Sequence, residues 1–305
     1  MRRTKHWIWI LLCYALVALP AVAQEGKGDV VYVPTPQIVV DEMLRMAHVG
    51  PKDFVIDLGS GDGRIVITAA QKFGARGFGV DLDRYLLKKA RENAGKAGVT
   101  DKVRFVEQNL FETDLSQATV ITSYLLPEMN ERLRPKILAL KPGTRVVTHD
   151  YDMGEWLPDE QKTIIVPEKE VGDPGKSYVF FYVVPAVIAG RWESQLNVGG
   201  RGVDYVFDFD QGFQRVNGDM YVDGRKARLP VFKVHGDQLS FDVNLPQGNA
   251  MAMYRFQGRV QEKEITGTVT IGAGAGQKQI PWRARLTVPG ELRTSAIESA
   301  GRAIQ

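Results

Sequence analysis

The feature that most constrains the fold is the stretch of residues 54–64, Phe-Val-Ile-Asp-Leu-Gly-Ser-Gly-Asp-Gly-Arg. Its apolar start is typical of a buried parallel strand, and the apolar residues that follow Arg64 predict the start of a helix. The turn between them contains Gly59, Gly61 and Gly63, which have no Cβ atoms, so the backbone can approach a ligand closely. The helix start offers unpaired N–H groups. Together they predict a nucleotide-type cofactor cradle at the carboxyl end of the first strand of a doubly wound sheet.

The rest of the N-terminal half continues this alternation of strands and helices. Apolar runs predict further strands at residues 76–80, 103–107, 119–126 and 145–148, and a closing antiparallel hairpin of 163–166 with 177–184. Strands that alternate with helices build a mostly parallel sheet with helices on both faces. We therefore predict an α/β fold over residues 28–186, with a doubly wound, Rossmann-like, seven-stranded sheet.

The spacing of the glycines indicates the cofactor. A dinucleotide fingerprint requires G-x-G-x-x-G, but Arg64 stands where its third glycine belongs. An acid before G-x-G-x-G resembles the first motif of class I methyltransferases, which use S-adenosylmethionine (SAM). This resemblance implies that SAM binds at a set of motif residues: Asp57, Gly59, Ser60, Gly61 and Gly63.

Two later positions extend the predicted SAM site. Asp81 follows the second strand, about 20 residues beyond the glycine turn, where a carboxylate accepts hydrogen bonds from both ribose hydroxyls. Asp83 fits better as the N-cap of the next helix. Asn109 follows the third strand; class I enzymes often carry Asp at this position, where it contacts the adenine amino group. Asn can accept the same hydrogen bond through its carbonyl oxygen.

Two further segments narrow the resemblance. Residues 32–36 read Tyr-Val-Pro-Thr-Pro, and residues 124–130 read Tyr-Leu-Leu-Pro-Glu-Met-Asn. With the glycine motif they resemble a family of seven-strand protein-lysine methyltransferases. That family includes broad-specificity archaeal lysine methyltransferases. It also includes the mitochondrial enzyme that modifies the c subunit of ATP synthase. The resemblance covers roughly residues 30–158.

The family resemblance implies methyl transfer from SAM to a protein lysine. It places Thr35 near the cofactor and makes Tyr124, Glu128 and Asn130 the candidate catalytic residues at the methyl-transfer mouth. Burial of Tyr124 in the sheet core is the alternative. Glu128 is a candidate to accept the lysine proton or to bind the incoming ammonium, and His149 is its rival as proton acceptor.

The first 23 residues predict a secretory signal peptide. A basic start, an apolar stretch over residues 7–19 and an Ala-x-Ala site at 21–23 follow in order. We therefore expect an exported, periplasmic or extracellular protein; the alternative is an uncleaved anchor in the inner membrane. Export would separate the enzyme from SAM, which is made in the cytosol.

Charge and cysteine content exclude some functions. The chain has 39 Lys and Arg against 36 Asp and Glu, and residues 1–23 contain three of the bases and no acid. Their removal leaves 36 against 36, and a neutral protein binds nucleic acid poorly. The one cysteine, Cys13, lies in this segment. We expect no nucleic-acid partner and no metal site.

The C-terminal third predicts a second domain, residues 190–288. Strands with period-2 alternation are separated by Asn217-Gly218 and Asp223-Gly224 turns, which favours antiparallel hairpins in a small barrel or sandwich. Trp192 and Trp282 are expected to fill its interior, and residues 289–305 to form a flexible tail. This domain is a candidate contact for an envelope or membrane-associated partner. A small-molecule methyltransferase and a non-catalytic envelope binding protein remain alternatives for the whole chain.

Overall fold

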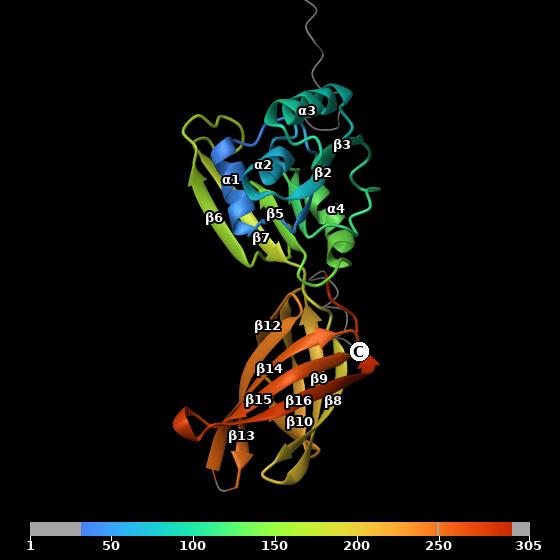
Figure 1. Cartoon of the computed structure of the whole chain (residues 1–305). Coiled ribbons are helices and arrows are strands. Elements are labelled where there is room, and N and C mark those ends of the chain that lie inside the picture. The colour runs from blue at the N-terminus through green and yellow to red at the C-terminus, as the bar shows by residue number, and fades with distance from the viewer. Residues whose placement is uncertain (1–31, 249, 295–305) are drawn as a thin grey trace, which may run out of the picture.

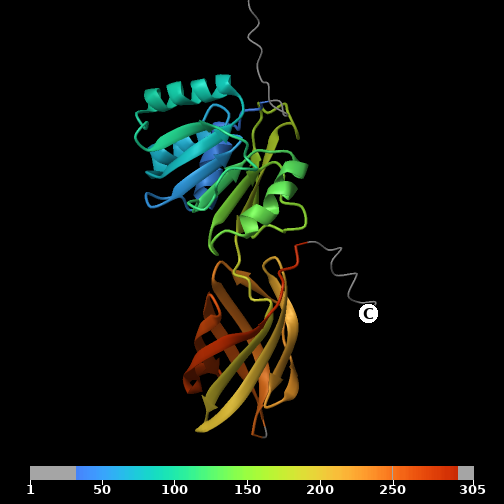
Figure 2. The ribbon, with the colours of Figure 1, turned by 90° about the vertical axis from the view of Figure 1, so that its right-hand side faces the viewer.

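The computed structural model describes residues 32–248 and 250–294. The predicted signal peptide at residues 1–23 and the start of the predicted first domain at residue 28 lie outside the described residues. The chain forms two lobes joined at a narrow waist, a layered α/β lobe and a β-barrel lobe (Figures 1 and 2). Within the described residues, no helix is long and apolar enough to cross a membrane.

The first lobe is built on the predicted seven-stranded, mostly parallel sheet. Its order is β3-β2-β1-β4-β5-β7-β6, and β7 runs in the direction opposite to the other six strands. The strands are β1 Phe54–Leu58, β2 Arg76–Asp81, β3 Val103–Glu107, β4 Val120–Ser123, β5 Arg145–His149, β6 Glu160–Ile165 and β7 Lys176–Val183. The order of the strands reverses at β1, which has β2 on one side and β4 on the other. The connections that leave the carboxyl ends of β1 and β4 therefore separate and leave room for a ligand.

Helices cover both faces of this sheet. Consecutive strand residues point to opposite faces, and the apolar residues on each face pack under helices. Val55 packs in the core beneath helices α1 and α2, whereas Ile56 packs in the core beneath α4. Helix α3 packs on α2 and β3. The helices are α1 Gln37–Met46, α2 Arg64–Phe73, α3 Arg84–Ala97 and α4 Pro127–Leu138.

Three local details differ from the sequence prediction. Helix α1 was not predicted. Strand β4 ends at Ser123, so the last part of the predicted strand 119–126 is the connection that leads out of the sheet. Helix α4 begins at Pro127, where the fixed φ of proline suits the first helical turn. Glu128 and Asn130 are therefore helical.

The second lobe is a closed antiparallel barrel, which decides between the barrel and sandwich predictions. Eight strands close through the pairing of β10 with β9, and β11 is an extra strand on β10. The strands are β8 Gly190–Val198, β9 Arg201–Gly212, β10 Arg215–Val222, β11 Arg225–Arg228, β12 Phe232–His235, β13 Gln238–Gln247, β14 Ala250–Gln261, β15 Glu264–Ile271 and β16 Lys278–Pro289; the short 3₁₀ helix Gly274–Gly276 joins the last two.

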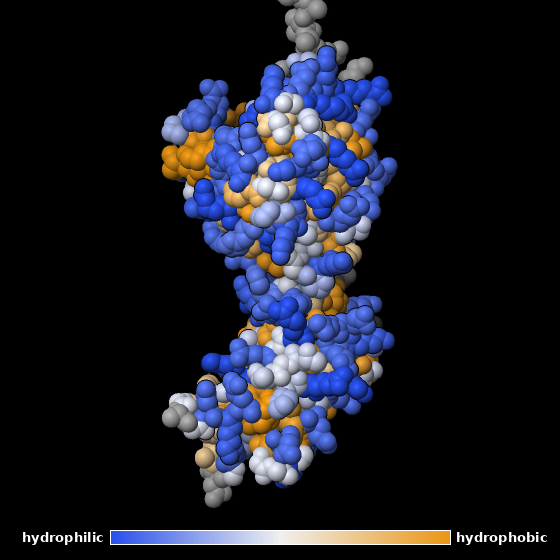
Figure 3. Space-filling view, in the orientation of Figure 1, coloured by the Kyte–Doolittle hydropathy of each residue, from blue (hydrophilic) through white to orange (hydrophobic). Residues whose placement is uncertain are grey.

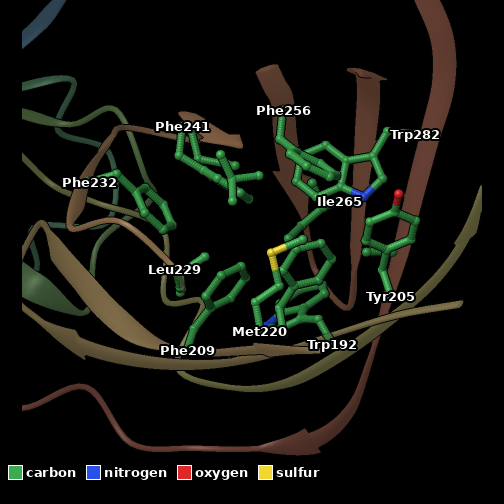
Figure 4. Close-up of a cluster of buried hydrophobic side chains, with 14 of the residues drawn as sticks. Trp192, Tyr205, Phe209, Met220, Leu229, Phe232, Phe241, Phe256, Ile265 and Trp282 are labelled. Carbon is green, nitrogen blue, oxygen red and sulfur yellow. The ribbon is translucent and has the colours of Figure 1, made fainter. Parts of the chain in front are cut away.

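Aromatic side chains fill the barrel. Trp192 and Trp282 are buried in it, as predicted, and the rings of Phe207, Phe241 and Phe256 pack against each other and against Trp282. Figure 4 shows that the labelled side chains, among them Trp192, Phe241 and Trp282, point inward from strands on opposite sides. A small barrel filled in this way is a packed core.

One predicted hairpin turn is wrong. Asn217 and Gly218 lie inside β10 and pair with Asp210 and Phe209 of β9. A Cβ on Gly218 would lie 2.0 Å from the Asp208 carbonyl oxygen, so the glycine allows a close approach of two strands rather than a turn. Asp223 and Gly224 do form a turn, both with positive φ.

The waist between the lobes is held by specific contacts. The Trp156 ring lies parallel to the Phe213 ring at 6.4 Å, and the Gln214 side chain donates to the Leu157 carbonyl. Arg134 of α4 donates to the carbonyl oxygens of Met153 and Thr294. The start of the predicted tail is held here too: Arg293 bonds the backbone of Gln211 and pairs with Asp210. Residues 295–305 lie outside the described residues.

Candidate functional site

A pocket lies at the carboxyl ends of β1, β2 and β4, where the glycine turn was predicted to hold a cofactor. Every residue that lines it falls between Tyr32 and Arg132, so the barrel contributes none. It contains seven of the predicted site residues: Thr35, Asp57, Gly59, Ser60, Asp81, Asn109 and Tyr124. Gly61, Gly63, Glu128 and Asn130 do not line it.

The three glycines of the turn have different tasks. All have positive φ, which favours glycine. Gly59 lines the pocket. A Cβ on Gly61 would lie 2.3 Å from the Tyr32 ring, and one on Gly63 would lie 2.5 Å from the Phe105 ring. Gly61 and Gly63 therefore let the turn pack beneath the pocket.

Asp57 lies at the end of β1, buried in the floor of the pocket. Its carboxylate accepts a hydrogen bond of 2.7 Å from the Thr122 hydroxyl. Burial raises the pKa of Asp57 to about 7; the Thr122 hydrogen bond opposes this shift, and the carboxylates of Asp81 and Asp62 add to it. A cationic group in the pocket would stabilise the ionised form.

Asp81 holds the turn and faces the pocket. One carboxylate oxygen accepts from the Gly61 N–H at 2.8 Å and the other from the Asp83 N–H at 2.9 Å. Each oxygen has a further lone pair, so the carboxylate can still bind a diol. Asp83 caps α3, as predicted, by accepting from the Tyr85 and Leu86 N–H groups.

Asn109 lines the pocket with its side chain already engaged. Its carbonyl oxygen accepts from the Phe111 N–H at 3.0 Å, and its amide donates to Glu112 at 3.3 Å. This local turn orients the side chain. The predicted contact with adenine would use the remaining lone pair of the carbonyl oxygen.

The pocket has the unpaired polar groups that a bound cofactor would satisfy. Ser60 is 5% exposed, and within residues 32–248 and 250–294 neither its hydroxyl nor the buried Tyr32 hydroxyl has a hydrogen-bond partner. Both residues line the pocket. Buried hydroxyls are rarely left without partners, so both hydroxyls are available to polar atoms of a ligand in the pocket. The residues present therefore fit SAM.

The pocket also contains three residues that the sequence patterns did not assign to the site: Tyr32, Asp62 and Arg64. The Arg64 guanidinium pairs with the Asp62 carboxylate at 2.7 Å and donates to the Thr35 carbonyl at 2.8 Å, which ties residues 32–35 over the glycine turn. Burial, with a smaller contribution from Asp62, raises the pKa of Tyr32 to about 12. Tyr32 and Arg64 lie within the segments that carry the family resemblance, so the sequence did contain a signal for them.

Tyr124 forms the end of the pocket away from β2. It is half-buried, and its hydroxyl donates to Asp150 at 2.9 Å. Asp150 also pairs with the buried Lys169 ammonium at 2.6 Å. Burial, and then the neighbouring Asp150 carboxylate, raises the pKa of Tyr124 far above its usual value. Tyr124 is therefore a fixed, neutral hydroxyl at the edge of the pocket, rather than part of the sheet core.

His149 is buried behind Tyr124 and is a poor proton acceptor. Its two ring nitrogens lie 3.2 Å from the Thr35 hydroxyl and 3.0 Å from the Ser177 hydroxyl, and its ring centroid lies 3.9 Å from that of Tyr124. Burial lowers the pKa of His149 to about 4, although Asp150 opposes the shift. The imidazole is neutral near pH 7 and supports the Tyr124 ring.

Asn130 and Glu128 lie on α4 at different depths. Asn130 is fully buried, and its amide donates to the carbonyl oxygens of Tyr151 and Asp152, so it fixes the connection after β5. Glu128 is exposed in the first turn of α4, outside the pocket. Among the described residues, no group of three or more His, Cys, Asp or Glu could hold a metal ion.

Comparison with known proteins gives a consistent result. The model of the ANTKMT methyltransferase domain matches residues 57–160. The protein-lysine N-methyltransferase of Saccharolobus islandicus is 48% identical over 131 residues, which are 42% of this chain and 81% of that protein. The adenine nucleotide translocase lysine N-methyltransferase of Mus musculus is 32% identical over 131 residues, 43% of this chain and 57% of that protein.

A solved structure is also similar to about half of this chain. It is described as an RNA methyltransferase from Salinibacter ruber in complex with S-adenosyl-L-homocysteine; it is 50% identical, with a TM-score of 0.46, and the match covers 51% of this chain and 96% of that chain. The archaeal relative is matched over most of its own length. The family model matches residues 57–160, which contain the glycine turn. The chain therefore belongs to the SAM-dependent methyltransferase family that contains the protein-lysine N-methyltransferases.

Proposed function

We propose that the first lobe transfers a methyl group from SAM to the amine of a protein lysine. One observation supports this most: the cofactor pocket is lined, just after β4, by Tyr124, whose hydroxyl is held in place by Asp150, and by Met129 and Arg132 of α4. The named activities of the archaeal and mouse relatives agree with this acceptor.

The residues present would hold the cofactor in an ordered way. Asp81 would accept from the ribose hydroxyls, Asn109 would face the adenine, and Asp57 and Ser60 would face the polar amino-acid end. The sulfonium of bound SAM supplies the reactive methyl group. The protein's own task is to exclude water and to orient the acceptor amine in line with that group.

The acceptor lysine must lose a proton before attack, since its ordinary pKa is about 10.4. His149 is neutral and bonded at both nitrogens, and Asp150 is paired with Lys169. Neither is placed to take the proton. We infer that the partly desolvated mouth lowers the lysine pKa and that the proton leaves to water, while Tyr124 orients the amine through its oxygen.

The experiment is methyl transfer from labelled SAM, followed by intact-mass measurement of lysine peptides, a mixture of small amines and a single-stranded RNA. Label in lysine peptides alone supports the proposal. Label in small amines with none in peptides would instead support a small-molecule methyltransferase, and label in RNA would support the activity described for the Salinibacter protein. The variant Tyr124→Phe should lower kcat about 10-fold or more while calorimetry shows unchanged SAM affinity.

A non-catalytic binding role for the barrel has less support. Its interior is filled by aromatic side chains, and among the described residues Ser60 and Tyr32, two residues with buried unpaired hydroxyls, line the cofactor pocket of the first lobe. SAM binding without transfer to any acceptor would favour that role.

We also propose that the chain acts outside the cytoplasm, as its first 23 residues predict, with an envelope protein as acceptor or barrel partner. N-terminal sequencing of the mature protein would test cleavage after Ala23.

A further inference from the structure

The rim of the methyl-transfer mouth is acidic on both sides. One side is the start of α4, with exposed Glu128 next to Leu126, which is 39% exposed. The other is the β6–β7 connection, residues 167–175, with exposed Glu168 and Glu170. These two segments flank the hydroxyl of Tyr124: α4 follows it in the chain, and the connection supplies Lys169, which pairs with Asp150.

The rim carboxylates are unpaired. Within the part of the chain that the structure describes, the side chains of Glu128, Glu168 and Glu170 have no hydrogen bond or ion pair. Two cations at this edge of the sheet are already used: Arg64 pairs with Asp62, and Lys169 is buried against Asp150. Two exposed cations, Arg132 over the Phe111 ring and Lys176 at the start of β7, have no ion pair within the described residues, so the unpaired charges at the rim are three acids against two bases. The barrel shows the opposite pattern, with exposed arginines paired to acids across neighbouring strands.

Exposed apolar side chains accompany these acids. Val171 is 53% exposed within the β6–β7 connection, and Ile165 is 63% exposed at the end of β6. Figure 3 shows hydrophobic colour over the end of β6, beside hydrophilic side chains. A rim of free carboxylates with apolar contacts is complementary to a segment that carries several positive charges and an apolar residue.

We propose that the mouth selects acceptor lysines in basic protein segments, docked between the start of α4 and the β6–β7 connection. This inference rests on the proposed lysine methyltransferase activity and names its substrate class. The rim acids attract arginine and lysine residues that flank the acceptor, and they repel the phosphates of RNA. The acceptor amine passes between the two acidic sides to Tyr124.

The test compares two peptides that differ only in charge. Each has one acceptor lysine and the same apolar residues, flanked by arginines in one and by glutamates in the other. We expect the arginine-flanked peptide to have a KM at least about 10-fold lower, and this preference to shrink in about 0.5 M salt, where the Debye length is about 4 Å. Equal KM values for the two peptides would overturn the inference and leave lysine methylation standing.

Charge reversal locates the effect. Glu170→Lys and Glu128→Lys should each raise the KM of the arginine-flanked peptide about 5-fold, with SAM affinity retained in calorimetry. Glu262→Lys is the matched control: it is an exposed acid on the barrel, in the turn between β14 and β15, and should change neither value. Equal effects of Glu170→Lys and Glu262→Lys would show that net charge alone acts. Methylation of RNA but of neither peptide would instead reject the proposed function.

Discussion

At the scale of single residues, two buried titratable groups near the pocket oppose one another. The pKa of Asp57 is raised from 3.8 to about 7, and that of His149 is lowered from 6.5 to about 4, in both cases mainly by burial. Between pH 4 and 6.5 the folded protein keeps a proton on Asp57 that the unfolded chain releases. Over the same range the unfolded chain binds a proton on His149 that the folded protein does not.

The signs of the two contributions predict how stability depends on pH in the protein without cofactor. The Asp57 contribution falls by about 4 kcal/mol as pH rises from 4 to 7, and the His149 contribution falls by about 3 kcal/mol as pH drops from 6.5 to 4. The two contributions therefore largely cancel. Relative to wild type, Asp57→Asn should therefore gain stability as pH rises from 4.5 to 6.5, and His149→Gln should lose it. Urea unfolding at three pH values measures both slopes; slopes of the same sign would contradict the assignment.

A second residue-scale prediction concerns Gly61. Alanine at this position must adopt a φ of 50° and push the Tyr32 ring away from the turn. A left-handed conformation costs about 1–2 kcal/mol for residues with a Cβ, so SAM should bind at least about 10-fold more weakly to Gly61→Ala. Gly95→Ala is the control, because a Cβ there meets nothing within 4 Å inside α3. Calorimetry that shows unchanged SAM affinity in Gly61→Ala would refute this role.

At the scale of elements, α3 depends on its cap. The Asp83 carboxylate satisfies two N–H groups of its first turn, so Asp83→Ala should lower the free energy of unfolding by about 1 kcal/mol. The Asp83 N–H still donates to Asp81, and SAM affinity should change little. Asp101→Ala, at an exposed acid before β3, provides the comparison and should leave stability unchanged within about 0.5 kcal/mol. Equal losses in the two variants would argue against a capping role.

At the scale of the whole molecule, the two lobes have separate hydrophobic cores. Trp282 belongs only to the barrel core, and the cofactor pocket lies wholly in the first lobe. Trp282→Ala should destabilise the barrel by about 3–5 kcal/mol and leave SAM affinity unchanged. Val288→Ala, on the exposed side of the same strand, should have little effect. Loss of SAM binding in Trp282→Ala would show that the contacts at Trp156 and Phe213 make the lobes one folding unit.

The sequence alone determined the parts of this protein that depend on local order. The strand, the glycine turn with Asp57 and Asp81, and the cap at Asp83 follow from patterns of a few residues, because sterics and hydrogen bonding act over that range. Strand alternation likewise predicted the parallel sheet and the second β domain.

Tertiary structure decided the rest, since it depends on groups far apart in the chain. Only folding brings Tyr32 over Gly61 and the Asp150–Lys169 pair behind Tyr124. The same limit explains the error at Gly218. An Asn-Gly pair is locally typical of a turn, but here it pairs with β9, so closely that a Cβ on Gly218 would lie 2.0 Å from the Asp208 carbonyl oxygen. Burial then decides the chemistry: the pKa values of Asp57 and His149 follow from the loss of water around them, which no short segment of sequence records.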